Sequence, residues 1–230
     1  MTEEIKRTTE SGKFKGPIPL LPAGKDYLWG GSRLRDDFSK NIPLTPLAET
    51  WECSTHPDGL SLLAGDPDKT LHELLQENPW MFGTHPAKSM PEAVEKGELP
   101  VLIKFIDAAS DLSVQVHPDD TYAKEHENGQ LGKSEMWYVV DAAPGANLVY
   151  GFSHDMDRDR VREAAQNGTL EKHLQRVPIR KDDVFFIPAG TVHAIGGGSL
   201  IAEVQESSNL TYRLYDYHRI GKDGKERPLH

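Results

Sequence analysis

The sequence predicts a mainly β fold, a barrel or sandwich with helical decorations. Short runs of strand length, either apolar or alternating, recur along the chain, and turns rich in Gly and Pro separate them. The longest stretches with helical patterning cover residues 69–99 and 157–175. The 230 residues suffice for a domain with a sizeable core, and no repeat or Ser/Gly linker divides them.

The N-terminal quarter combines a charged start with short strands and turns. Residues 1–16 lack the apolar stretch of a secretory signal, so we expect a frayed start there. Residues 14–30 carry Pro and Gly at intervals typical of short strands and turns. Within residues 47–63, a turn sequence at 57–59 separates two mixed runs and predicts a hairpin.

A helical block interrupts the strands at residues 69–99. Leu71, Leu74 and Leu75 have helical spacing, and Pro79 limits the first helix. We therefore expect a small helical insertion in this part of the chain.

The rest of the chain returns to strands, with two further helices. One helix is expected near 120–127 and the other over 157–175. Asp155 or Asp157 could cap the second helix, and Gly168 could end it. The strands are expected at 99–108, 112–118, 134–140 and 147–151, and in four runs between 183 and 217.

Composition and charge exclude several classes of protein. The charge sum is 26 − 36 = −10 with His neutral, and an acidic chain repels phosphate backbones, so we expect no nucleic-acid partner. No segment approaches the ~18 apolar residues of a membrane span, so we expect no membrane partner. Cys53 is the one cysteine, which excludes an internal disulfide and a cysteine metal cage and fits a reducing cytoplasm. A site for an anionic substrate would be a basic island in a negative field.

Three motifs carry candidate chemistry, and the first lies on an expected strand. Ser113, Gln115 and His117 alternate along that strand and therefore share one face. The apolar residues between them, together with Leu112, point to the other face. From spacing alone, the polar row could also be a solvated sheet face.

The other two motifs place a histidine and a carboxylate near strand ends. A tight turn at 188–190 precedes His193, and Glu135 leads into an apolar strand. Taken alone, His193 is typical of a structural histidine in a turn, and Glu135 is typical of a surface charge at the start of a strand. Together with Gln115 and His117, they supply two imidazoles, a carboxylate and an amide oxygen, a donor set that suits a first-row divalent ion without thiolate ligands. The ligand charge of −1 would leave a bound dication as a Lewis acid.

Four segments of the chain, in this order, resemble the type I mannose-6-phosphate isomerases, zinc enzymes of the cupin superfamily: SVQVHPDD, GKSEMWYVV, FFIPAGTVHAIGGG and EVQESSNLTYRLYDYHR. The resemblance runs from about residue 14 to 219, and the length is similar to that of the compact bacterial branch. It implies a cupin jelly-roll β-barrel, with one domain over residues 1–230 and a helical insertion around 69–99. It also implies interconversion of mannose 6-phosphate and fructose 6-phosphate through a cis-enediol.

The resemblance also assigns metal ligands. One Zn²⁺ per chain would be held by Gln115, His117, Glu135 and His193. The chain departs from the longer relatives at Gly132 and Ser134, where those have His and Pro. A second departure is at Asp182 and Asp183, where the cupin pattern often has Gly.

The family's catalytic positions match Lys133, Glu203 and Arg213. Glu203 is the better candidate for the base, although it could instead orient a histidine, and Lys133 is the second candidate. Arg213 could stabilise the enediolate or hold the phosphate, and the alternative is a structural ion pair with Asp216. The positions that line the substrate pocket match Lys104 and Ser113. The alternative for Lys104 is a snorkelling side chain.

Two other classes of function stay open. One is a different cupin enzyme, either another sugar isomerase or an oxygenase, although Gln115 argues against the ligand set of an oxygenase. The other is a non-catalytic module that binds sugar phosphates. Such a module need not keep the metal ligands, Glu203 and Arg213 together. The sequence leaves open the native metal, the base, the residues that grip the phosphate, and the oligomeric state.

Overall fold

The computed structural model describes residues 16–230, so the expected frayed start at 1–15 lies outside the described residues. The described residues divide into two compact units, one of residues 16–23 and 51–103 and the other of 24–50 and 104–230. Our expectation of a single domain over the whole chain stays a prediction. Over the described range, no helix has the length and apolar character needed to cross a bilayer.

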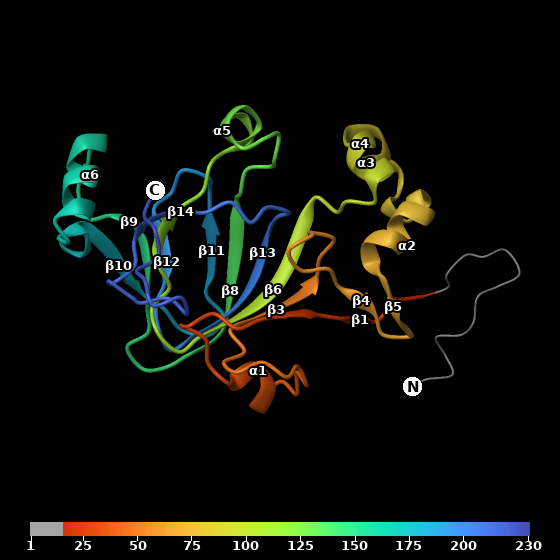
Figure 1. Cartoon of the computed structure of the whole chain (residues 1–230), viewed down its shortest axis with the longest axis horizontal. Helices are drawn as coiled ribbons and strands as arrows, with labels where there is room; N and C mark the ends of the chain where they lie inside the picture. The colour runs from red at the N-terminus through yellow and green to blue at the C-terminus, as the bar shows by residue number, and fades with distance from the viewer. Residues whose placement is uncertain (1–15) are drawn as a thin grey trace, which may run out of the picture. The chain divides into compact units, whose positions relative to one another are not determined.

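The first unit contains the expected helical block (Figure 1). Its strands form a sheet of order β1-β4-β5 and cover Leu20–Leu21, Leu62–Leu63 and Asp66–Thr70. The helices are α2 (Leu71–Glu77), η1 (Pro79–Phe82), α3 (Thr84–Ser89) and α4 (Pro91–Lys96). Thr70 and Glu73 form a capping box that begins α2. The leucines at helical spacing pack in one buried cluster with Leu63.

The hairpin expected within residues 47–63 is wrong. Its turn forms, since the Gly59 amide donates to the His56 carbonyl at 2.9 Å. The flanking strands, however, belong to different sheets, because β4 pairs with β1 and β5, whereas β3 (Glu49–Cys53) lies between β6 and β2. The turn sequence thus sets the bend, while partners distant in sequence set the strand pairing.

Two antiparallel sheets position the remaining strands. The six-stranded sheet has the order β11-β8-β13-β6-β3-β2, and the five-stranded sheet has the order β10-β9-β12-β7-β14. In the six-stranded sheet, the strands other than β3 cover Ala23–Lys25 (β2), Val101–Ala108 (β6), Glu135–Ala142 (β8), Val184–Ile187 (β11) and Ser199–Glu206 (β13). The five-stranded sheet contains Val114–Val116 (β7), Asn147–Phe152 (β9), Leu174–Pro178 (β10), His193–Ile195 (β12) and Tyr212–Tyr215 (β14).

One apolar core contains side chains of both sheets. Trp137 and Ile201 come from the six-stranded sheet, and Leu148 and Ile195 come from the five-stranded sheet. Two antiparallel sheets with a shared core are the layers of a β-sandwich or jelly roll. The predicted mainly β fold is therefore confirmed, and a parallel sheet with crossover helices is excluded by the antiparallel registers of β8, β13 and β11.

The helices of the second unit are α1 (Arg33–Asp36), α5 (Asp120–His126), α6 (Arg158–Gln166) and η2 (Leu170–His173). The helix expected over 157–175 is shorter, because α6 ends at Gln166 and β10 begins at Leu174, but the predicted signals at its two ends are confirmed. Asp157 is the N-cap and accepts a hydrogen bond from the Arg160 amide at 2.9 Å. Gly168, between α6 and η2, has a φ of 70°. Ala164 of α6 packs in a buried cluster with Val149 and Ala194 of the five-stranded sheet.

Leu112 departs from the expected alternation. Val114 packs in the cluster that contains α6, whereas Leu112 joins the core that the two sheets share. The reason is that β7 begins only at Val114. Leu112 precedes the strand, and its amide donates to the Ile195 carbonyl at 2.9 Å.

Candidate active site

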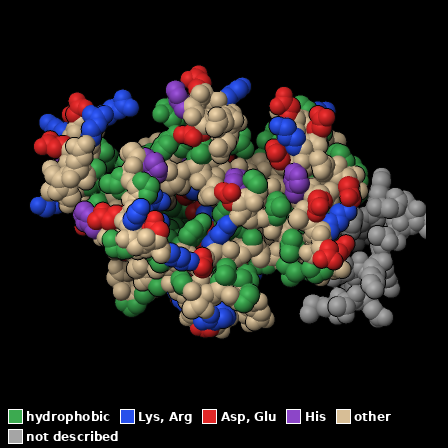
Figure 2. Space-filling view, in the orientation of Figure 1, with side chains coloured by type: hydrophobic (Ala, Val, Ile, Leu, Met, Phe, Trp, Pro, Cys, Tyr) green, Lys and Arg blue, Asp and Glu red, His purple; other side chains and the backbone are tan. Residues whose placement is uncertain are grey.

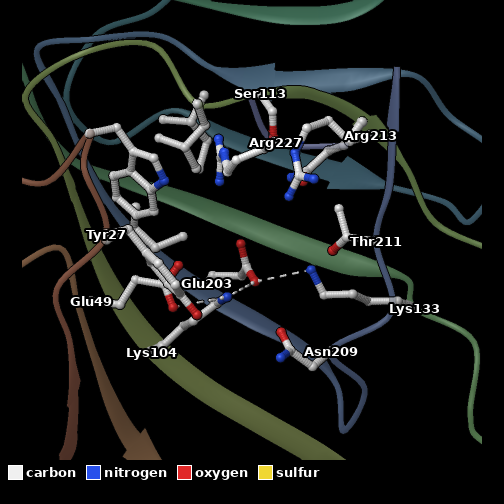
Figure 3. A pocket seen from close by; sticks show the side chains of 15 residues that line it. Tyr27, Glu49, Lys104, Ser113, Lys133, Glu203, Asn209, Thr211, Arg213 and Arg227 are labelled. Atoms are coloured by element: carbon white, nitrogen blue, oxygen red, sulfur yellow. Dashed lines mark ion pairs between the residues drawn. The ribbon is translucent and has the colours of Figure 1, made fainter. Parts of the chain in front are cut away.

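A cavity of about 310 Å³ lies in the second unit, within the size range of small-molecule sites (Figure 3). Strands of both sheets contribute to its wall. Figure 2 shows acidic, basic and hydrophobic side chains interspersed over the face that it displays. Its lining includes all five predicted site residues other than the metal ligands: Lys104, Ser113, Lys133, Glu203 and Arg213. Gln115, one of the predicted metal ligands, lines it as well.

His117 and His193 are buried, and each leaves the Nε2 atom of its ring available to accept a hydrogen bond or bind a metal. The Nδ1 atom of His117 donates to the Leu210 carbonyl at 2.7 Å, and that of His193 donates to the Thr191 carbonyl at 2.8 Å. Both rings therefore keep Nε2 as the nitrogen that can accept. The ring centroids lie 4.8 Å apart. The Nε2 atom of His193 is buried and has no hydrogen-bond partner among the described residues.

Glu135 completes a compact three-residue cluster with these histidines. One ligand atom from each residue lies within 4.8 Å of the others, and all three side chains are buried. Glu135 Oε1 lies 2.7 Å from His117 Nε2, while its Oε2 atom is buried with no hydrogen-bond partner in the described range. Lys133 forms an ion pair with Glu135, and its Nζ lies 3.1 Å from His117 Nε2.

The protonation states in this cluster fit a divalent cation. Burial, together with the charge of Lys133, lowers the pKa of His117 to about 3. Burial also lowers the pKa of His193. Burial alone would raise the pKa of Glu135, but Lys133 and His117 hold it well below its usual value. Zinc accepts two neutral imidazoles and one carboxylate as ligands. Two atoms of this cluster, His193 Nε2 and Glu135 Oε2, are buried without a hydrogen-bond partner among the described residues.

Gln115 and Ser113 share the cavity face of β7, although Ser113 precedes the strand. Gln115 is the Cα partner of His193 on β12 and of Arg213 on β14. Directly opposed residues of antiparallel strands point to the same face, so these three side chains are neighbours. Ser113 is buried, as is His117, so the polar row is not a solvated sheet face.

Glu203 lies at the centre of a buried charge network. Its Oε2 accepts a hydrogen bond from Trp137 Nε1 at 2.8 Å, and its Oε1 lies 3.2 Å from Lys104 Nζ. Lys104 also pairs with Glu49 at 3.5 Å and is buried, which excludes a snorkelling side chain. Burial and the charge of Glu135 raise the pKa of Glu203, and the lysines oppose that rise. Burial would lower the pKa of Lys104, but its carboxylate partners raise it.

Arg213 reaches the cavity without an ion pair to Asp216. Its Nη1 donates to the Pro228 carbonyl at 3.0 Å, and its buried Nε has no hydrogen-bond partner among the described residues. The Asp216 carboxylate instead pairs with Arg219 and Arg227. The alternative of a structural Arg213–Asp216 pair is therefore wrong.

Sequence reasoning missed several cavity residues: Tyr27, Trp29, Glu49, Asn209, Thr211 and Arg227. Trp29 both packs in the core and lines the cavity. The others lie outside the three motifs. Arg227 follows the last motif, and no local pattern distinguishes it from a surface arginine.

Comparisons with known proteins agree with this architecture. Residues 18–142 match the family model for phosphomannose isomerase type I, catalytic domain. The Bacillus subtilis protein named probable mannose-6-phosphate isomerase GmuF is 41% identical over 216 residues, which make up 93% of this chain and 65% of that protein. The mannose-6-phosphate isomerase of Streptococcus mutans is 40% identical over 216 residues, with the same two shares.

A solved structure gives the same result for the fold. The crystal structure of the mannose 6-phosphate isomerase from Bacillus subtilis superposes with a TM-score of 0.84 at 39% identity, covering 94% of this chain and 66% of that one. The chain thus spans just under two thirds of the length of these relatives.

Proposed function

This chain belongs to the type I phosphomannose isomerase family, and on that premise we propose that it interconverts mannose 6-phosphate and fructose 6-phosphate with the help of one bound zinc ion. The observation that carries the proposal is the pairing of the buried His117–Glu135–His193 cluster with a neighbouring cavity that holds carboxylates, lysines and arginines. A sugar phosphate needs both features, a centre for the sugar oxygens and cations for the phosphate.

The proposed zinc ligands are Gln115, His117, Glu135 and His193. Two observations support this assignment. His193 Nε2 and Glu135 Oε2 have no hydrogen-bond partner among the described residues, and hydrogen bonds to backbone carbonyls fix both imidazoles. When bound, zinc would supply Lewis-acid stabilisation of negative charge on the sugar oxygens. The amide of Gln115 is the only neutral oxygen donor in the set, and its position opposite His193 supports its inclusion.

Aldose–ketose isomerisation moves a proton between C1 and C2, so the site needs a base that faces the sugar. We assign the base to Glu203, because burial raises its pKa toward the pH at which proton transfer is efficient. Trp137 and Lys104 hold the carboxylate in place. Lys133 is the second candidate, and its Nζ lies 3.8 Å from Glu203 Oε1 on the cavity wall.

Arg213 is the proposed stabiliser of the negative charge that develops during the reaction. Its unpartnered Nε, on a strand next to Gln115, supports a donor role toward the reacting end of the sugar. Ser113 and Lys104 are the proposed lining residues, with Lys104 acting through its hold on Glu203.

The test is a coupled assay that follows fructose 6-phosphate formation from mannose 6-phosphate. We expect activity that a chelator abolishes and added zinc restores. Tight binding of mannose 6-phosphate without turnover in the zinc-loaded protein would instead identify a non-catalytic binding module. Turnover that survives complete metal removal would contradict the zinc assignment while leaving the isomerase activity in place.

A further inference from the structure

The arginines beside the cavity carry more positive charge than their neighbours neutralise. Both cavity lysines are ion-paired, Lys104 with Glu203 and Glu49, and Lys133 with Glu135 and Glu203. The arginines differ, because Arg213, Arg219 and Arg227 have one carboxylate, Asp216, between them. Within the described residues, this arginine group therefore keeps a net charge of 3 − 1 = +2.

Such an excess is costly in a partly buried wall and indicates an anionic ligand. Arg213 and Arg227 both line the cavity, and Figure 3 shows their guanidinium groups on the same side of it. Burial, and then the charge of Arg227, lowers the pKa of Arg213, as expected when two cations are held together. The whole chain has a net charge of −10, so this local positive charge lies in a protein that is otherwise negative.

Arg227 is fixed in a geometry that leaves one nitrogen available. Its Nε and Nη2 donate to the two oxygens of Asp216, each at 2.6 Å. Arg219 binds the same carboxylate at 2.6 Å, so Asp216 is fully engaged. Among the described residues, Arg227 Nη1 has no hydrogen-bond partner, and the fork to Asp216 restricts the directions in which it can donate.

We propose that Arg227 binds the phosphate group of the substrate, an inference that rests on the isomerase function proposed above. A phosphate monoester carries about −1.5 to −2 at pH 7, which is opposite in sign to the excess charge of the arginine group. Arg213 lies on the strand next to Gln115, at the proposed metal end, whereas Arg227 comes from the segment after β14. Arg213 keeps the role proposed above, and Arg227 is the neighbouring arginine that we assign to the phosphate.

Two variants of Arg227 test this assignment in the zinc-loaded full chain. Arg227→Met removes the charge, and Arg227→Lys keeps the charge but removes the fork to Asp216. Arg162→Met, at an exposed arginine of α6, is the matched control. The measurements are KM and kcat for mannose 6-phosphate, kcat/KM for unphosphorylated mannose, and binding of inorganic phosphate by calorimetry.

For Arg227→Met we expect KM and the phosphate Kd to rise about 10- to 100-fold, the effect of losing one charge-assisted hydrogen bond. We expect a smaller rise for Arg227→Lys, and wild-type values for Arg162→Met. The residual activity on mannose should change less than about twofold, since that substrate lacks the group that Arg227 contacts. Thermal unfolding curves identify any variant that fails to fold. If Arg227→Met does not fold, the wild type is compared with Arg227→Lys instead.

The outcomes separate the two proposals. Wild-type KM and wild-type phosphate affinity in folded Arg227→Met would overturn the assignment of Arg227 while the isomerase activity stands. An equal loss of activity on mannose and on mannose 6-phosphate would also overturn it. If the wild-type chain shows no isomerisation but binds phosphate through Arg227, the isomerase function fails and the phosphate site stands.

Discussion

Glu203 combines three properties that a catalytic base requires. It is buried, its two oxygens are held by Trp137 and Lys104, and its pKa is raised by burial and by Glu135. Glu203→Gln keeps the shape and removes the basic oxygen. We expect it to stop exchange of the C2 proton with solvent deuterium, measured by NMR, while the metal content stays at the wild-type level.

The pH dependence follows from the same shift. Only the carboxylate form can accept a proton, and a raised pKa means that this form is lost at a higher pH than for an ordinary glutamate at about 4.3. The acid limb of kcat/KM should therefore lie above that value. If Glu203→Gln exchanges the C2 proton at the wild-type rate, Glu203 is not the base, and Lys133 becomes the residue to test.

Substitution of Arg213 by lysine separates the contribution of positive charge from that of the planar guanidinium geometry at the reacting end of the substrate. Lysine supplies the charge without a planar pair of donors, so Arg213→Lys should lose the contact made by the free Nε edge. We expect kcat to fall by the equivalent of about 2.7–4 kcal/mol, with a smaller change in KM. Arg162→Lys serves as the control. A change in KM alone would show that Arg213 binds substrate and transition state equally.

At the scale of elements, the turn between β10 and β11 explains a departure from the cupin pattern. Asp182 stands where that pattern often has Gly, and its φ is 74°. This left-handed conformation costs most residues roughly 1–2 kcal/mol and glycine nearly nothing. The Asp182 amide donates to the Val139 carbonyl at 2.9 Å, which ties the turn to β8.

Asp182→Ala should therefore be less stable than Asp182→Gly by roughly 1–2 kcal/mol. Both variants lose the contact of Asp182 with Tyr138, so their difference isolates the backbone conformation. Urea unfolding of the two variants measures it. Equal midpoints and slopes would show that the turn relaxes away from positive φ.

The elements that sequence patterns predicted well are those fixed by neighbours along the chain. The cap at Asp157 and the leucine spacing of α2 are local signals, and both are confirmed. The hairpin within 47–63 failed because β3 and β4 pair with strands far away in sequence. Glu49 and Arg227 were missed because they come to the cavity from β3 and from the segment after β14, which are both distant in sequence from the three motifs. His117, Glu135 and His193 were found because each stands in a motif, and the structure brings the three together.

At the scale of the whole molecule, the proposed metal links binding to stability. All four proposed ligands lie in the second unit, on three strands and the residue after β7, so the bound state requires the folded sheets. A ligand that binds only the folded state stabilises it by about 2.7 kcal/mol at 100 times its Kd. For a chain of this size, 1 kcal/mol corresponds to a Tm shift of roughly 2–4 °C.

We therefore expect zinc at 100 times its Kd to raise the Tm of the chelator-treated protein by roughly 5–11 °C. His193→Ala should lose both the bound zinc and the Tm increase, because its Nε2 is one of the orphaned donors. His85→Ala, at an exposed histidine of α3, should keep both. Calorimetry with zinc and with chelator measures the shift, and metal analysis after gel filtration measures the stoichiometry. If the two units melt separately, only the transition of the second unit should move. Stoichiometric zinc or an undiminished Tm increase in His193→Ala would remove His193 from the ligand set.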